Sequence, residues 1–221
     1  MSEIPLPTRP FSALLFDMDG TIISSIASAE RVWSRWAEAH GLDVTSFLPT
    51  IHGVQSVETI RRLNLPGVDP KAEAAAITRA EMEDVGDITE IAGARAFLKA
   101  LPPERWAIVT SAPRALATRR LAAAGMPLPD LMVAAEDVRH GKPAPDCFLM
   151  AAERLGVAAP ECLVFEDAPA GIQAAEAAGA TVLVVTATHH RPVSAGHAAI
   201  PDYRGLLVEA AADGIRVIAR T

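Results

Sequence analysis

Two aspartates, Asp17 and Asp19, follow an apolar run that ends at Phe16, and they precede Gly20 and Thr21. An apolar run that stops at a turn is typical of a strand buried on both faces of a parallel sheet. Side chains two positions apart on an extended chain point to the same side, so both carboxylates are expected to face one space. Like charges this close are costly unless a cation or a shared proton relieves them. The pattern predicts acid–base or metal chemistry, with a solvated Asp-Gly turn as the alternative.

Two further segments hold groups suited to binding an anion. Thr110 and Ser111 follow the apolar run 106–109, just before Pro113, and offer a hydroxyl and backbone N–H groups at a strand-to-helix turn. A serine at this position also fits an ordinary helix N-cap. Lys142 stands between a glycine and a proline, which fix its backbone, although a solvated loop lysine is the alternative.

A second acidic pair, Glu166 and Asp167, comes directly after the apolar run 162–165. Capping of the next helix by Asp167 is the alternative interpretation. In open α/β sheets, chemistry is found beyond the carboxyl ends of the strands. The two acidic pairs are therefore expected at one site.

The rest of the chain must position these groups, and most of it alternates strand-length apolar runs with helical patterns. The expected strands are 106–111, 131–135, 162–167 and 181–186, and the expected helices are 94–101, 113–124, 145–155 and 169–178. This rhythm predicts an α/β fold with a Rossmann-like parallel sheet and crossover helices. Asp213-Gly214 before a branched run predicts an antiparallel strand near the C-terminal end.

The block between the first strand and residue 91 has a different pattern. Helical periodicity runs through 57–63 and 71–85, prolines interrupt it, and no convincing strand appears. We expect a core domain at 1–23 and 92–221 and a helical cap domain at 24–91, with hinges at 24–25 and 90–93. Trp33 and Trp36 are expected in the interior of the cap.

Composition bounds the function. Half of the 221 residues are hydrophobic, which argues against disorder, and the net charge of −7 comes without a basic block. No nucleic-acid partner is therefore expected. No apolar run has the length of a membrane span, and residues 1–10 show no signal-peptide core. Cys147 and Cys162 have no metal-ligand spacing, which favours a reducing cytoplasm. A monomer or a small homo-oligomer is expected.

The four motifs occur in the order and kind found in the haloacid dehalogenase (HAD) superfamily, which this chain resembles from Ala13 to about Thr188. More locally, residues 52–55, 106–111 and 164–171 resemble the branch of hexose-phosphate, 2-deoxyglucose-6-phosphate and glycerol-3-phosphate phosphatases. One departure is Ala112-Pro113, where that branch often carries glycine followed by a hydroxyl residue.

The resemblance implies a phosphatase that works through an aspartyl-phosphate. Asp17 would be the nucleophile and Asp19 the general acid and base, while Lys142 would offset the negative charge. The phosphate would be bound by groups at the first strand, the Ser111 turn and the lysine, namely Met18, Asp19, Ser111, Ala112 and Lys142. Mg²⁺ would be the cofactor because the available ligands are all oxygen atoms. Its site is assigned to Asp17, the carbonyl of Asp19, Asp167 and Glu166, with Glu166 orienting the ligands.

The cap would then cover the site and select a small phosphorylated sugar or polyol. His52 and Gln55 are the candidate substrate residues, with a surface-loop histidine as the alternative for His52. A β-phosphoglucomutase-like mutase is one rival, and a non-catalytic HAD-fold binding protein is the other. In the related mutases the cap supplies a lysine and an arginine where this chain has His52 and Ser56. Arg61 and Arg62 follow closely and remain candidates to replace them.

Overall fold

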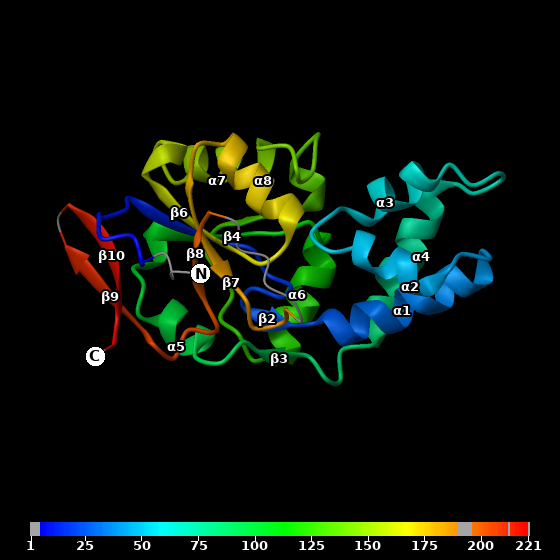
Figure 1. The fold of residues 1–221 in the computed structure, drawn as a ribbon, viewed down its shortest axis with the longest axis horizontal. Coiled ribbons are helices and arrows are strands. Elements are labelled where there is room, and N and C mark those ends of the chain that lie inside the picture. Colours follow the sequence, from blue (N-terminus) through cyan, green and yellow to red (C-terminus); the bar gives the residue numbers. More distant parts are fainter. Residues whose placement is uncertain (1–4, 190–195, 212, 221) are drawn as a thin grey trace.

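A six-stranded sheet lies at the centre of the larger part of the molecule, and every adjacent pair of its strands is parallel (Figure 1). This computed structural model describes residues 5–189, 196–211 and 213–220. The strand order is β5-β4-β1-β6-β7-β8. The bounds are β1 Ala13–Phe16, β4 Trp106–Val109, β5 Met132–Val133, β6 Cys162–Glu166, β7 Thr181–Val185 and β8 Ala198–Ile200. The predicted α/β fold with a Rossmann-like parallel sheet is confirmed.

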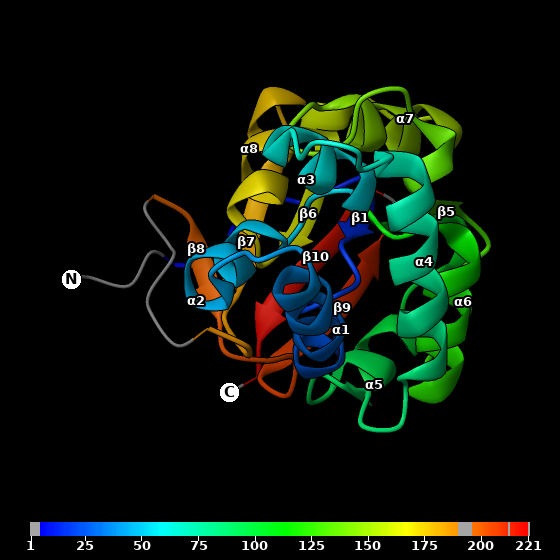
Figure 2. The same cartoon turned by 90° about the vertical axis from the view of Figure 1, so that its right-hand side faces the viewer.

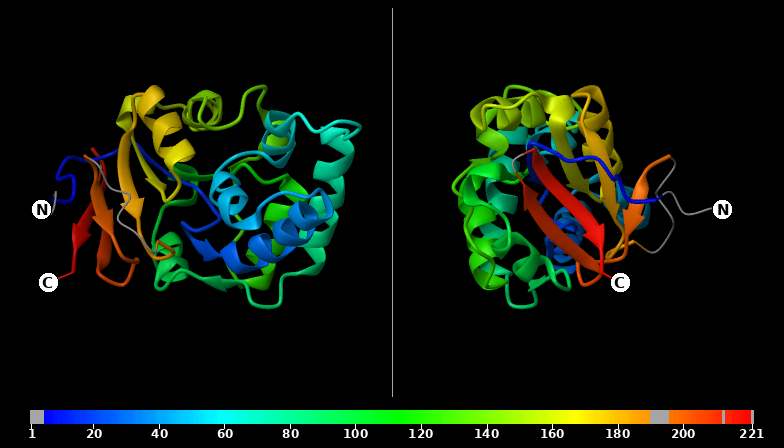
Figure 3. Two further views of the ribbon diagram at one scale, coloured as in Figure 1. Left: turned by 45° about the vertical axis from the view of Figure 1, so that its right-hand side comes forward. Right: turned by 90° about the vertical axis from the view of Figure 1, so that its left-hand side faces the viewer.

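Helices cover both faces of this sheet (Figures 1 and 3). They are α5 Ala94–Lys99 and α6 Arg114–Ala123 on one face, and α7 Asp146–Arg154 and α8 Pro169–Ala177 on the other. Along β1, Leu14 and Phe16 pack with the first pair of helices, whereas Ala13 and Leu15 pack with the second. Because both faces are buried, every residue of β1 is apolar.

Short 3₁₀ helices precede or follow several of these elements: η1 Leu48–Thr50, η2 Pro103–Arg105, η3 Ala135–Asp137 and η4 Ala159–Glu161. The predicted antiparallel strand is also present, as β10 Gly214–Ala219 paired with β9 Leu206–Ala211. This hairpin forms its own sheet at the end of the molecule away from the helical block (Figure 3). Ala212, which belongs to the predicted turn, lies outside the described residues. Strand β8 was not predicted, because the run Ala198–Ile200 is too short to show periodicity.

The inserted block consists of α1 Ile26–Ala39, α2 Val44–Phe47, α3 Ser56–Leu63 and α4 Pro70–Glu83. It has an apolar cluster of its own, in which the rings of Trp33 and Trp36 meet edge to face at 5.6 Å. Both tryptophans are buried there, as expected, and Trp33 also reaches the cavity described below. Figure 2 looks onto this block, which we call the cap. None of the described helices is long and apolar enough to cross a membrane.

A two-stranded antiparallel pair lies where the chain enters and leaves the cap. It joins β2 Ile23–Ser24 to β3 Thr89–Glu90. The expectation that no strand lies between residues 24 and 90 is wrong at these two ends, because a two-residue strand leaves no periodicity in the sequence. The domain boundaries at 24 and 91 stay a prediction.

Candidate active site

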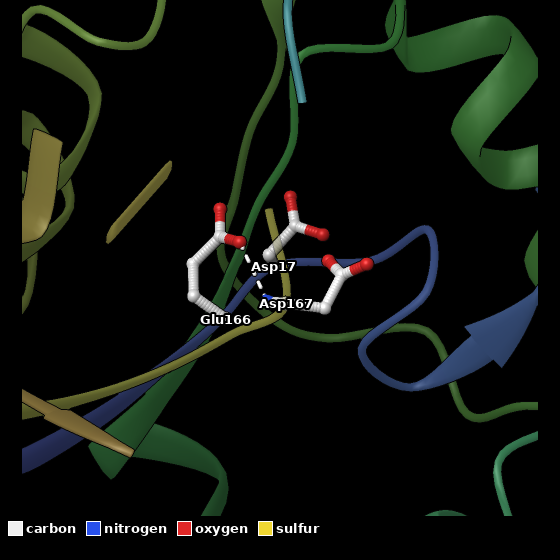
Figure 4. Close-up of side chains that lie close together, drawn as sticks. All are labelled: Asp17, Glu166 and Asp167. Atoms are coloured by element: carbon white, nitrogen blue, oxygen red, sulfur yellow. Dashed lines mark hydrogen bonds between the residues drawn. The ribbon is translucent and has the colours of Figure 1, made fainter. Parts of the chain in front are cut away.

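The register of the central strands brings the two acidic pairs together. Phe16 of β1 is opposite Phe165 of β6, and the N–H of Asp17 donates to the Phe165 carbonyl at 3.0 Å. Asp17 therefore leaves its strand beside Glu166 and Asp167. Ligand oxygens of the three carboxyl groups lie within 4.8 Å of one another, and all three residues are buried (Figure 4). Three acids in so small a volume repel one another strongly.

Lys142 is the cation of this cluster. Its Nζ donates to Asp17 Oδ1 at 2.5 Å, to Glu166 Oε1 at 2.7 Å and to the Val109 carbonyl at 3.1 Å. Although burial disfavours its charge, Asp17 and Glu166 raise the pKa of Lys142, so it stays protonated. One ammonium group faces three carboxyl groups. The cluster therefore lacks positive charge when all three are ionised.

Burial also disfavours the ionised forms of two of the acids. Burial raises the pKa of Asp17 to about 8, against the opposing effect of Lys142. Burial, followed by repulsion from Glu166 and Asp17, raises the pKa of Asp167 well above its usual range. A divalent cation between these carboxylates would favour their ionised forms, so the residues present fit a metal site.

Glu166 is held firmly in the structure. Its Oε2 accepts the N–H groups of Asp167 and Ala168 at 2.7 and 2.8 Å, while its Oε1 is paired with Lys142. Asp167 in turn accepts the Thr21 hydroxyl at 3.1 Å. The sequence marks Glu166 and Asp167 as a pair, but only the structure shows that Glu166 already uses both oxygens within the protein.

Asp19 lies in the same cavity but in a different network. Its Oδ1 accepts the Ser25 hydroxyl at 2.5 Å and lies 3.0 Å from Nη1 of Arg120, which comes from α6. Nη2 of Arg120 is 3.2 Å from Oε1 of Glu81 on cap helix α4. Arg120 and Glu81 were not predicted as site residues, since charged residues in predicted helices are ordinarily placed on the solvated face.

The turn that follows Asp17 is compact. Met18 is fully buried, and its carbonyl accepts N–H groups from the following turn. Gly20 has φ +87°, and a Cβ at this position would lie 2.1 Å from Asp167 Oδ2. Only glycine combines this left-handed conformation with so close an approach to the carboxyl group.

The predicted phosphate-binding turn follows β4, the strand that pairs with β1. The Ser111 hydroxyl donates to the carbonyl of Gly53 in the cap at 2.8 Å, and the N–H of Ala112 donates to the Thr110 hydroxyl at 3.1 Å. Both Ser111 and Ala112 line the cavity. Their role in phosphate binding stays a prediction, because both donors have partners within the protein here.

The two cap candidates lie in different places. His52 lines the cavity, and burial lowers its pKa although Glu30 is only 3.4 Å away. The imidazole is therefore mostly neutral at pH 7. Gln55 lies outside this cavity and donates to the Ala135 carbonyl at 3.0 Å, so the structure places it in a contact between cap and core.

Together these groups provide a buried carboxylate aligned by an ammonium group, a second carboxylate two residues on, and a cavity closed by a helical cap. This arrangement is typical of α/β enzymes that cleave esters through covalent catalysis by an aspartate. The family model for haloacid dehalogenase-like hydrolases matches residues 11–179, so the chain belongs to that hydrolase family.

Relatives place the chain more closely. It is 41% identical over 182 residues to hexitol phosphatase A of Escherichia coli, covering 80% of this chain and 84% of the relative. It is 30% identical over 211 residues to 2-deoxyglucose-6-phosphate phosphatase 2 of Saccharomyces cerevisiae, covering 85% of each. A solved hydrolase from Pseudomonas syringae superimposes with a TM-score of 0.72 at 27% identity, covering 81% of this chain and 87% of the other. The predicted branch of the superfamily is confirmed.

Proposed function

We propose that this protein is a Mg²⁺-dependent phosphatase that hydrolyses small sugar or polyol monophosphates through an aspartyl-phosphate on Asp17. The observation that carries the proposal is the placement of Asp17: a buried carboxylate at the end of β1, bonded to Lys142 and open to a cavity that Asp19 shares. Relatives named as hexitol and 2-deoxyglucose-6-phosphate phosphatases support the substrate class.

The first step forms a bond between a carboxylate oxygen of Asp17 and phosphorus while the bond from phosphorus to the sugar oxygen breaks. Asp19 gives its proton to the departing oxygen. In the second step water attacks the phosphorus, Asp19 takes a proton from it, and the Asp17–phosphorus bond breaks to release inorganic phosphate. Lys142 keeps the nucleophile oriented and offsets the charge that the incoming phosphate adds.

The donor set fits Mg²⁺, which prefers carboxylate, carbonyl and water oxygens. Asp17 and Asp167 would hold it with the carbonyl of Asp19, and Glu166 would orient the site through Lys142 and the backbone. When bound, the ion supplies positive charge that weakens the repulsion between carboxylate and phosphate.

The mutase alternative has less support, because a bisphosphate needs a second cationic anchor under the cap. His52 is mostly neutral, and Ser56 is uncharged. Arg61 and Arg62 are about half exposed and paired with Glu58 on their own helix. Within the part of the chain that the structure describes, Arg120 is the only cationic side chain lining the cavity apart from the weakly basic His52, and two carboxylates already contact it.

The test is a phosphate-release screen over hexose, pentose, polyol and triose phosphates, with and without Mg²⁺. We expect the wild-type protein to hydrolyse sugar or polyol phosphates, and we expect Asp17→Asn to abolish this turnover. Absence of turnover on every phosphate would leave the non-catalytic alternative. A parallel incubation with glucose 1-phosphate and glucose 1,6-bisphosphate, followed by phosphorus NMR, distinguishes a mutase from a phosphatase. Formation of glucose 6-phosphate faster than inorganic phosphate would overturn the phosphatase.

The oligomeric state and the cytoplasmic location stay predictions.

A further inference from the structure

Arg120 lies between the proposed acid–base residue and the cap. It comes from α6 of the core, and its guanidinium contacts Asp19 Oδ1 at 3.0 Å and Glu81 Oε1 at 3.2 Å. The side chains of Arg120 and Glu81 are each only 5% exposed, whereas that of Asp19 is 28% exposed. A buried guanidinium is stable only when carboxylates compensate its charge, and here one of the two carboxylates belongs to the cap.

Both contacts to the Asp19 side chain converge on one oxygen. The Ser25 hydroxyl and Arg120 Nη1 meet at Oδ1, and no described residue forms a hydrogen bond with Oδ2. A protonated carboxyl group has one O–H donor and accepts at its other oxygen. A donated hydroxyl and a cationic guanidinium both lie at Oδ1, which makes Oδ2 the oxygen that carries the proton and leaves it free for the cavity that Asp19 lines.

We propose that Arg120 is a positioning residue that fixes the proton-donating oxygen of Asp19 and depends on Glu81 of the cap for its own placement. This inference rests on the proposed phosphatase. It links the position of the cap to proton transfer, because the cap supplies the carboxylate that holds the far side of the guanidinium. A cap that has moved away leaves Arg120 with Asp19 alone.

The two carboxylates depend on Arg120 in different ways, which ranks the variants. Both lie within ion-pair distance of the guanidinium, but Arg120 contacts Asp19 directly, whereas Glu81 acts on Asp19 only through Arg120. Loss of Glu81 should therefore disturb Asp19 less than loss of Arg120 itself.

The experiment compares two esters that differ in their need for an acid. p-Nitrophenolate leaves without a proton, whereas the oxygen of an alkyl phosphate such as glycerol phosphate needs one. The variants are Arg120→Met, Arg120→Lys and Glu81→Gln, with Asp19→Asn to set the full effect of losing the acid. Arg119→Met is the matched control: Arg119 is the exposed neighbour on α6, and it donates a long hydrogen bond of 3.4 Å to the Met82 carbonyl of the cap.

Arg120→Met should lower kcat/KM for the alkyl ester about 10- to 100-fold more than for the aryl ester, since small misplacements of a catalytic group have effects of that order. Glu81→Gln should shift the ratio in the same direction by less, and Arg120→Lys should restore part of it. Arg119→Met should leave the ratio unchanged. Equal losses on both esters would show a structural role alone and overturn the proposal.

Arg120→Met leaves two carboxylates without their cationic partner and can impair folding. The double variant Glu81→Gln/Arg120→Met keeps the net charge of the three side chains, and it should show the same selective loss; an unchanged ratio would overturn the inference. A wild-type enzyme inactive on every phosphate would instead refute the proposed function. In that case crystal structures of Arg120→Met and Arg119→Met decide, and an unmoved Asp19 carboxyl group in Arg120→Met contradicts the positioning role.

Discussion

Gly171→Ala should displace Glu166 and so disturb the active site, although alanine is the better helix former. Gly171 lies in the first turn of α8, directly against Glu166. An ideal Cβ at this position would lie 1.5 Å from Glu166 Oε1 and 2.0 Å from its Cδ. Glu166 is fully buried and bonded to Lys142 at 2.7 Å, so it cannot move aside without losing that pair.

The size of the effect follows from these contacts. Breaking a buried ion pair costs about 3–5 kcal/mol, and alanine in place of glycine returns at most about 1 kcal/mol of helix propensity. We therefore expect a net loss of about 2–4 kcal/mol in the free energy of unfolding. Activity and Mg²⁺ affinity should fall as well, because Lys142 loses the partner that orients it towards Asp17.

Urea unfolding at equilibrium measures the loss, and Gly86→Ala provides the control, since a Cβ at Gly86 meets nothing within 4 Å. The clash involves Glu166, so the cost of Gly171→Ala should shrink in a Glu166→Ala background. Gly171→Ala that is as stable and active as Gly86→Ala would refute the reasoning, and so would full additivity of the double variant.

Three further outcomes are expected. Asp17→Asn should abolish turnover while urea unfolding shows a folded protein, and retention of more than a small fraction of kcat would exclude the aspartyl-phosphate. Treatment with EDTA should remove activity, and Asp167→Asn should raise the Mg²⁺ concentration needed for half-maximal rate more than it changes stability; a full rate in EDTA would remove the metal from the mechanism. Burial raises the pKa of the thiols of Cys147 and Cys162 to about 11 from 9.0. Each thiolate fraction near pH 8 is therefore about 100-fold lower than for an ordinary thiol, and a thiol reagent should modify the native protein far more slowly than the urea-unfolded chain.

Much of the core could be predicted because parallel strands buried on both faces leave continuous apolar runs. β1, β4 and β6 each occur as such a run, and a candidate reactive residue follows each strand within two positions: Asp17, Ser111 and Asp167. The short strands β2, β3 and β8 left no pattern, since two or three residues carry no periodicity. These strands form only by pairing with other strands: β2 pairs with β3, and β8 pairs with β7.

Arg120 shows where sequence reasoning stops. Arg119 and Arg120 are adjacent in the chain, and their residue type alone gives no reason to distinguish them. Arg120 is buried because it lies on the side of α6 that faces cap helix α4, where it contacts Glu81, whereas Arg119 is exposed. Which of the two faces a carboxylate depends on the packing of helices from different parts of the chain, which no local pattern records.

Ser111 makes the same point for a residue that the sequence did single out. Its position after β4 predicts a hydroxyl for a phosphate, but in the structure that hydroxyl donates to the Gly53 carbonyl of the cap. A serine hydroxyl has one proton, so it cannot donate to Gly53 and to a phosphate oxygen at once. Binding of a phosphate at this turn therefore exchanges one contact for another across the boundary between cap and core. The sequence identifies Ser111 as a hydroxyl group suited to binding phosphate. Only the fold shows that Ser111 must first give up its hydrogen bond to Gly53.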